Sequence, residues 1–339
     1  MARAVWKKLT SDPSIQRSSQ ALSVIGSNAY IYGGELRPRE PVGSSVYRIS
    51  HDRENTSNAQ ITTLPPTNPS PQPRVGTAST TIGDKIYLFS GRGGVAMAPL
   101  EEDGSLWVFD TKSTSWGQIS PTPGTPFPQG RSYHALTSNG TDTIYLHAGC
   151  PTTDRLSDLW AFVVTTKVWK ELPEAPGPAR GGTSISFSNG KIYRMNGFDG
   201  KTEQGGALDV FDTATNEWKT ITFPGDGISG PEARSVAALL AVNISGRESL
   251  VTLFGERDPS SLGHAGAGKM LGDVWAFDIG DEKWSQVAVS EDDDGKPAAR
   301  GWFDADVAAL EGGRSGIVVH GGLAESNERL GDVWLLGFE

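Results

Sequence analysis

Six segments of the chain repeat one pattern, and each segment opens with an arginine. Successive arginines stand 49 to 66 residues apart, a spacing at which a whole supersecondary unit repeats. A unit of this size cannot bury its apolar face alone, so stacked copies form either an open solenoid or a closed ring. The six arginines are Arg17, Arg74, Arg131, Arg180, Arg234 and Arg300.

Each arginine is followed by four short apolar or aromatic runs. The first two runs are joined by turns rich in glycine and asparagine, such as residues 139–142, which supply the positive φ of a tight hairpin. The third and fourth runs carry tryptophans nine residues apart, as at Trp107 and Trp116. Four strands per repeat correspond to one blade of a β-propeller.

The last repeat, residues 300–339, contains only three such runs. Residues 5–9, which precede the first arginine, have the composition of the missing fourth strand. Pairing that strand with the run around Trp334 would close the ring and leave no exposed sheet edge at the junction. We therefore predict an all-β, six-bladed propeller that occupies residues 1–339 as a single domain, its last blade closed by the N-terminal strand.

The net charge and the cysteine content indicate which partners and which cellular compartment to expect. The formal net charge is −10 and no basic stripe interleaves with aromatics, so neither nucleic acid nor a membrane surface is an expected partner. The single cysteine, Cys150, cannot form an intramolecular disulfide, which fits a reducing compartment. We expect the protein to be cytoplasmic, with the nucleus as a second location.

Two long loops between the second and third strands of their repeats mark the predicted functional face. They span residues 92–104 and 256–268, and long loops on a rigid scaffold are where binding residues concentrate. The second loop holds Glu256, Asp258 and His264, whose carboxylate and imidazole groups suit a divalent metal such as Fe(II). A solvated polar loop is the alternative interpretation.

The repeats resemble the Kelch family along essentially the whole chain. The loops resemble those of the specifier proteins of glucosinolate breakdown, namely the nitrile-specifier, epithiospecifier and thiocyanate-forming proteins. That resemblance implies a Glu-x-x-x-Asp-x-x-x-His loop that holds Fe(II). Glu256 and His264 match it, Ser260 stands where the family has aspartate, and Asp258 is the nearest substitute.

The same resemblance implies a lyase that converts glucosinolate aglucones to nitriles or related products. The family's substrate-binding arginines match Arg92 and Arg155, which would anchor a small anionic, sulfur-containing substrate. Bound iron would act on the sulfur, while the protein supplies orientation and charge. Trp302 and Phe303 follow Arg300 outside the tryptophan register and are candidates for the pocket wall.

Two other functions stay open from the sequence. Kelch rings often bind peptides, so a non-catalytic module with a protein partner is one alternative. The other is a sugar epimerase similar to the Kelch-fold sialic acid mutarotases, with Arg, Glu and His side chains as clamp and acid–base pair.

Several further residues are assigned structural roles. The six repeated arginines are expected to hold blade edges together, in preference to forming a cationic ring. The strand histidines His134, His147 and His320 are expected in the interior, while His51 and the acidic run at residues 291–294 are expected in solvated loops.

Overall fold

The computed structural model describes residues 2–50, 59–291 and 295–339, and nearly all regular structure in these ranges is β-strand. Its helical segments are single 3-10 turns: η1 (Pro13–Ile15), η3 (Gly263–Ala265) and η4 (Glu311–Gly313). The all-β prediction is confirmed. His51 and residues 292–294 lie outside the described ranges.

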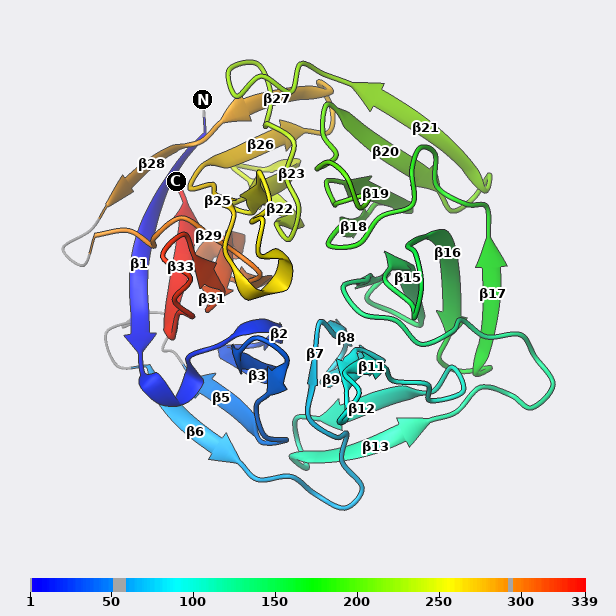
Figure 1. Ribbon diagram of the computed structural model, residues 1–339. Coiled ribbons are helices and arrows are strands. Elements are labelled where there is room, and N and C mark those ends of the chain that lie inside the picture. Colours follow the sequence, from blue (N-terminus) through cyan, green and yellow to red (C-terminus); the bar gives the residue numbers. More distant parts are fainter. Residues whose placement is uncertain (1, 51–58, 292–294) are drawn as a thin grey trace.

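Six sheets of four or five strands surround a common axis (Figure 1). In chain order the first comprises β2 (Ser18–Ile25), β3 (Asn28–Arg37), β5 (Val46–Ser50) and β6 (Gln60–Leu64); the second β8 (Ala78–Ile82), β9 (Lys85–Phe89), β12 (Leu106–Asp110) and β13 (Ser115–Ile119); the third β14 (Ala135–Ser138), β15 (Thr143–Gly149), β16 (Leu156–Val163) and β17 (Val168–Leu172). The fourth comprises β18 (Ser184–Ser188), β19 (Lys191–Met195), β20 (Ala207–Asp212) and β21 (Glu217–Thr222); the fifth β22 (Ala238–Ile244), β23 (Arg247–Leu253), β26 (Val274–Asp278) and β27 (Lys283–Gln286); the sixth β30 (Asp304–Ala309), β31 (Ser315–His320), β33 (Asp332–Phe338), β1 (Arg3–Ser11) and β28 (Ala288–Glu291).

Short two-residue strands lie at the starts of the repeats and in the loops. They are β4 (Glu40–Pro41), β7 (Arg74–Val75), β10 (Arg92–Gly93), β11 (Ala98–Pro99), β24 (Glu256–Arg257), β25 (Lys269–Met270), β29 (Arg300–Gly301) and β32 (Leu323–Ala324).

The first strand of the chain lies in the same sheet as the last. β1 pairs antiparallel with β33, with Trp6 opposite Leu336 and Lys8 opposite Trp334. The sequence places this strand at residues 5–9, whereas β1 runs from Arg3 to Ser11. β28 then pairs in parallel with β1, an extra strand that the repeat pattern does not predict.

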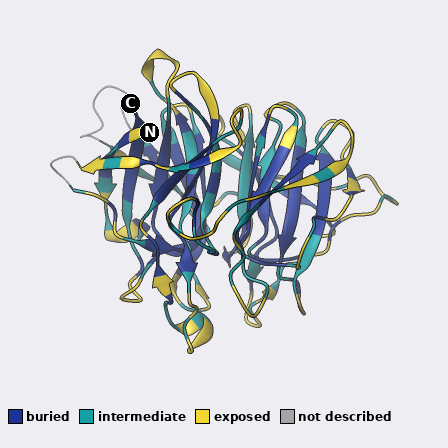
Figure 2. Ribbon diagram, turned by 90° about the horizontal axis from the view of Figure 1, so that it is seen from above, coloured by how far each residue is buried: buried dark blue, intermediate teal, exposed yellow. Residues whose placement is uncertain are grey.

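Apolar clusters fill the spaces between neighbouring sheets. Each described cluster draws its side chains from two successive sheets, and one of them joins the sixth sheet to the first through residues such as Val318, Leu335, Leu22 and Ile31. Viewed from the side, most strands are buried or half-buried and many exposed residues lie in the connections at both ends (Figure 2), although the outer strands β21 and β28 are largely exposed. Burial of these alternating side chains is the main stabilising contribution in such a stack of sheets.

Successive sheets are also joined by a closed circle of backbone hydrogen bonds around the axis. The residue two positions after each repeated arginine donates its N–H to the equivalent carbonyl of the preceding sheet, at 2.7 to 3.2 Å, and Ser19 donates to Trp302. All six residues have a positive φ, between 46° and 60°. This axial circle consists of Ser19, Gly76, Tyr133, Gly182, Val236 and Trp302.

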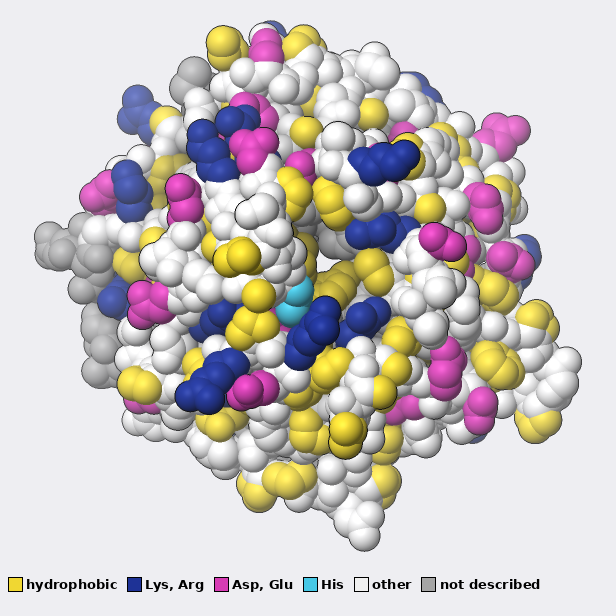
Figure 3. Space-filling view, in the orientation of Figure 1, with side chains coloured by type: hydrophobic (Ala, Val, Ile, Leu, Met, Phe, Trp, Pro, Cys, Tyr) yellow, Lys and Arg dark blue, Asp and Glu magenta, His cyan; other side chains and the backbone are white. Residues whose placement is uncertain are grey.

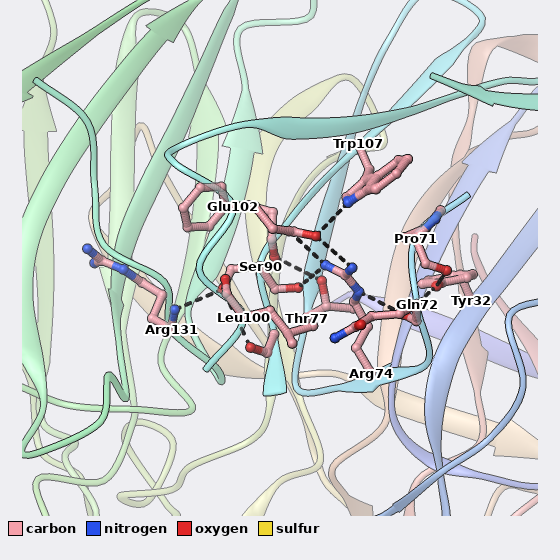
Figure 4. A network of polar contacts seen from close by, with 12 residues as sticks. Tyr32, Pro71, Gln72, Arg74, Thr77, Ser90, Leu100, Glu102, Trp107 and Arg131 are labelled. Carbon is pink, nitrogen blue, oxygen red and sulfur yellow. Dashed lines mark hydrogen bonds and ion pairs between the residues drawn. The ribbon is translucent and has the colours of Figure 1, made fainter. Parts of the chain in front are cut away.

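The repeated arginines are structural anchors, which confirms the preferred interpretation. Each is at most 6% exposed, and each donates from Nη1 to the carbonyl that precedes a glycine at the end of its second strand, at 2.9 to 3.2 Å. Arg74 also binds both carboxylate oxygens of Glu102, which accepts from the indole of Trp107 (Figure 4). Such buried charge-assisted pairs hold each strand entry in one geometry.

Within the residues described, no helix has the length and apolar character needed to cross a bilayer.

Candidate functional site

A cavity of about 380 Å³ lies above the axial circle. Loops from the second to the sixth sheets contribute to its wall, and lysine or arginine and histidine side chains gather around the central hollow on this face (Figure 3). Its volume is in the range of small-molecule sites. The side chains with reactive or charged groups are Arg92, Tyr133, Cys150, Asp154, Arg155, Glu203, Glu256, His264 and Trp302.

Arg92 and Arg155, the two predicted substrate-binding arginines, both line the cavity. Arg92 begins β10 directly after Gly91, and the guanidinium of Arg155 lies 5.1 Å from the centre of the Phe198 ring. The buried Nε atoms of both arginines have no hydrogen-bond partner among the described residues. Burial raises the pKa of the nearby Cys150 thiol, against the opposing effect of Arg155 and Arg92. Because the Nε atoms of Arg92 and Arg155 have no partner among the described residues, we take the two guanidinium groups to be available to an anion.

Glu256 supplies a buried carboxyl group to the same cavity. Its Oε1 accepts the N–H of Gly268 at 2.6 Å and its Oε2 accepts the indole N–H of Trp302 at 3.0 Å. Burial raises the pKa of Glu256 despite these two donors. Burial likewise raises the pKa of Glu203, which lines the same cavity. Sequence reasoning missed Glu203, although its position in the loop between β19 and β20 places it on the predicted face.

His264 enters the cavity from η3 and pairs with a residue of the first sheet. Its Nε2 lies 3.1 Å from Oε1 of Glu35, which is 1% exposed. Glu35 is also held by the backbone N–H of Arg39 at 2.7 Å and by the guanidinium of Arg329 at 3.4 Å. The sequence gives no signal for this pairing, because Glu35 and His264 belong to different repeats.

The three predicted metal ligands do not converge. Asp258 points its carboxylate to the Nε of Arg257 at 3.3 Å, with its side chain 72% exposed, while Glu256 and His264 are engaged as described above. No group of three His, Cys, Asp or Glu side chains suited to a metal occurs among the described residues. In this arrangement Glu256, Asp258 and His264 do not fit an iron site, and Fe(II) binding stays a prediction.

Trp302 and Tyr133 form an aromatic floor at the axial circle. Their rings are 5.2 Å apart and nearly perpendicular, and the ring of His264 lies 5.5 Å from that of Trp302. Phe303, predicted for the pocket wall, does not line this cavity: its ring meets that of Phe254 edge to face at 5.4 Å, below the circle. Trp302 and Phe303 lie in the short connection between β29 and β30, where the left-handed φ of Trp302 turns the chain between them.

The strand histidines belong to the interior. His134, His147 and His320 are each at most 6% exposed, and none of them lines the cavity. Burial lowers the pKa of His134 and of His320 to about 3 and that of His147 well below its usual value, so these rings are neutral. They have no access to a ligand in the cavity.

The arrangement can bind a small anion with a fixed orientation. Two guanidinium groups attract the charged end, and the carboxyl groups of Glu203 and Glu256, which line the same cavity, disfavour it near them when ionised. The aromatic floor offers an apolar surface for the remainder of the ligand.

Comparisons with known proteins agree with this fold. The KLHDC2/KLHL20/DRC7 Kelch-repeats domain matches residues 19–255. A protein named N-(sulfonatooxy)prop-2-enimidothioate sulfolyase from Thlaspi arvense is 26% identical, over 94% of this chain and 91% of its own. The human Kelch domain-containing protein 3 is 26% identical over 56% of this chain, which spans about half (50%) of that relative.

A solved structure supports the same architecture. The structure of YjhT superimposes with a TM-score of 0.70 and 15% identity, covering 97% of this chain and 99% of its own. At this identity the likeness concerns the fold alone. From the repeats, the sheets around one axis and the matched residues 19–255, the chain belongs to the KLHDC2/KLHL20/DRC7 Kelch-repeats domain family.

Proposed function

We propose that this protein binds a small organic anion between Arg92 and Arg155 and acts as a specifier-like lyase on sulfonatooxy compounds of the glucosinolate aglucone type. The observation that carries the proposal is the presence of both arginines in one cavity, with their buried Nε atoms unpaired among the described residues. The sulfolyase named above, which is similar over 94% of the chain, supports the substrate class.

The proposed role of the arginines is to hold the sulfonatooxy group and stabilise its departure. When the N–O bond breaks, the electron pair leaves with the sulfate, whose added negative charge two guanidinium groups stabilise. In the nitrile-forming reaction the C–S bond breaks as well: its electron pair forms the carbon–nitrogen triple bond, and the thiolate sulfur leaves as neutral sulfur. Glu203 and Glu256, which line the same cavity, would repel the sulfonatooxy group when ionised. Iron is assigned no step, because Glu256, Asp258 and His264 do not converge.

The scaffold in this proposal is one six-bladed ring. We infer that the six sheets are the blades of a single domain spanning residues 1–339, and that the pairing of β1 with β33 closes it. The axial circle supports this inference, because its hydrogen bonds run from each repeat to the next and from Ser19 back to Trp302. A rigid ring would keep the arginines of the second and third sheets at a fixed separation. A cytoplasmic location remains part of the proposal.

The test is product analysis with a glucosinolate and myrosinase. With the wild-type protein present, we expect nitrile or thiocyanate products at the expense of isothiocyanate, together with sulfate. The Arg92→Met and Arg155→Met variants should lose this effect by tenfold or more, as expected when a charge-assisted contact is removed. Arg37→Met is the matched control, because Arg37 is an exposed arginine paired with Glu40. Isothiocyanate alone at every protein concentration would refute the lyase assignment.

A second candidate is a protein-binding module. Leu36, Val95 and Leu262 are 47%, 108% and 72% exposed, and they lie in β3 and in the two loops that reach the cavity. Exposed apolar side chains around a loop face are typical of protein contacts. A stoichiometric partner that is lost with Val95→Glu or Leu262→Glu but kept with Arg92→Met would favour this function over catalysis.

A further inference from the structure

We propose that the cavity selects anions whose body is an aromatic ring, and that Tyr133 and Trp302 are the residues that make this selection. The inference rests on the proposed function only in that Arg92 and Arg155 hold the charged end. It adds the substrate class: an aryl or arylmethyl group attached to a sulfate or sulfonatooxy group.

The backbone at these two positions is the first argument. Every member of the axial circle has a left-handed φ, and glycine meets that requirement without strain at Gly76 and Gly182. Tyr133 and Trp302 adopt φ of 53° and 58°, which is costly for a bulky side chain. The fold alone would be served better by glycine there. A strained backbone conformation at a residue whose side chain lines a cavity indicates that this side chain has a functional role.

The neighbouring glycines make room for the aromatic floor. A Cβ at Gly76 would lie 2.8 Å from the Tyr133 ring, and a Cβ at Gly182 would lie 2.8 Å from Val236. Small and large residues therefore alternate around much of the circle, and the large side chains lean over the small ones. Below the axial circle runs a central tunnel, which the first strands of the sheets line. This arrangement places the two aromatic rings across the opening between the cavity and that tunnel.

The two rings are held in one orientation. The indole N–H of Trp302 donates to Glu256, whose other oxygen is fixed by Gly268. The Tyr133 ring meets Trp302 edge to face at 5.2 Å. Because neither ring needs to be ordered when a ligand binds, contact with a third ring incurs little entropic cost.

The two arginines and the aromatic floor lie close enough for a single ligand to contact both. Arg92, Arg155, Tyr133 and Trp302 all line the same cavity of about 380 Å³. Burial is the main cause that raises the pKa of the Tyr133 phenol, against the opposing effect of Arg92. The phenol therefore stays neutral. An aryl sulfate can place its sulfate on the guanidinium groups and its ring on the neutral aromatic floor.

Binding of phenyl sulfate and methyl sulfate tests the inference without turnover. These two probes share the anionic group and differ in the body. Calorimetric titration of the wild-type protein should give a preference of about tenfold or more for phenyl sulfate. Trp302→Gly and Tyr133→Gly, which also relieve the left-handed strain, should bring the ratio of the two affinities close to one. Trp302→Phe should keep most of the preference, since it keeps an aromatic ring.

Two variants separate this inference from the proposed function. Arg92→Met should weaken both probes by the same factor and leave their ratio unchanged, while Phe303→Leu, outside the cavity, should change neither. Equal affinity of the wild-type protein for both probes, or no affinity for either, overturns the inference even where product analysis shows a lyase. A preference that depends on Tyr133 and Trp302 upholds it even where no sulfate is released from a glucosinolate aglucone.

Discussion

Nη1 of Arg194 donates to a carboxylate oxygen of Asp209 at 2.7 Å inside the fourth sheet. Both side chains are buried, and β19 and β20 place them opposite each other. The third, fifth and sixth sheets have Asp-x-Trp on the equivalent strand, with the aspartate bound to the repeated arginine and to the indole of the tryptophan, as in Asp158 and Trp160. The fourth sheet has Ala207 and Asp209 instead, and Arg194 stands opposite Asp209 as Leu146 stands opposite Trp160 in the third sheet.

The first prediction concerns this exchanged pair. Asp209→Ala should lower the free energy of unfolding by about 3–5 kcal/mol, because it leaves the Arg194 guanidinium buried without its carboxylate. The triple variant Arg194→Leu, Ala207→Asp, Asp209→Trp restores the pattern of the other sheets and should recover most of that loss. Urea unfolding measures both values. An Asp209→Ala variant as stable as the wild type would show that the Arg194–Asp209 pair does not contribute to the free energy of unfolding.

The second prediction concerns Asp304, which lines the tunnel, and the pH dependence of the free energy of unfolding. Burial raises the pKa of Asp304 to about 7, although its carboxylate accepts the backbone N–H groups of Leu22 and Ala305. The unfolded chain releases this proton at about pH 4, so the folded state binds more protons between about pH 4 and pH 7. The free energy of unfolding should therefore fall as the pH rises through this window.

Asp304→Asn removes the titrating group and keeps an oxygen acceptor for Leu22. Unfolding measured at several pH values should show a flatter profile for this variant than for the wild type. Asp306, whose pKa burial raises to about 6, should contribute a weaker slope that Asp306→Asn removes. Identical pH profiles for the wild type and Asp304→Asn would contradict the assignment.

The third prediction concerns the axial circle. Gly76→Ala should destabilise the fold by about 1–3 kcal/mol, since it adds a Cβ 2.8 Å from the Tyr133 ring at a left-handed φ. Gly26→Ala is the matched control: its φ is +63°, yet nothing lies within 4 Å of the added Cβ. The difference between the two losses isolates the contact with Tyr133. If both variants lose the same stability, the steric argument at the circle fails.

The fold could be predicted from the sequence because its determinants recur. Arginine, glycine and tryptophan occupy equivalent places in successive repeats, and each meets the same local requirement, as Arg74 and Arg300 show by binding equivalent carbonyls. The parallel pairing of β28 was missed, because it occurs in one sheet alone and has no repeated signal.

The sequence brought several cavity residues to notice by different signals. Arg92 and Arg155 come from the family resemblance, and Trp302 from its place after Arg300 outside the tryptophan register. Its offset, two residues after the repeated arginine, would also have identified Tyr133. Glu35 could not be found, because its meeting with His264 depends on how loops from the first and fifth repeats bend across the face. Loop conformation is set by local contacts that leave no periodic trace.

The last prediction concerns Fe(II). For iron to bind at Glu256, Asp258 and His264, His264 must leave Glu35 and Asp258 must leave Arg257. If these side chains are the ligands, weakening the competing pairs should tighten Fe(II) binding. Glu35→Gln and Arg257→Met should each lower the dissociation constant severalfold in an anaerobic titration, because less free energy is needed to release the ligand. His264→Ala should abolish the same binding, whereas Arg37→Met serves as an exposed control. Iron affinity that is unchanged in all of these variants would place any bound iron elsewhere on the chain.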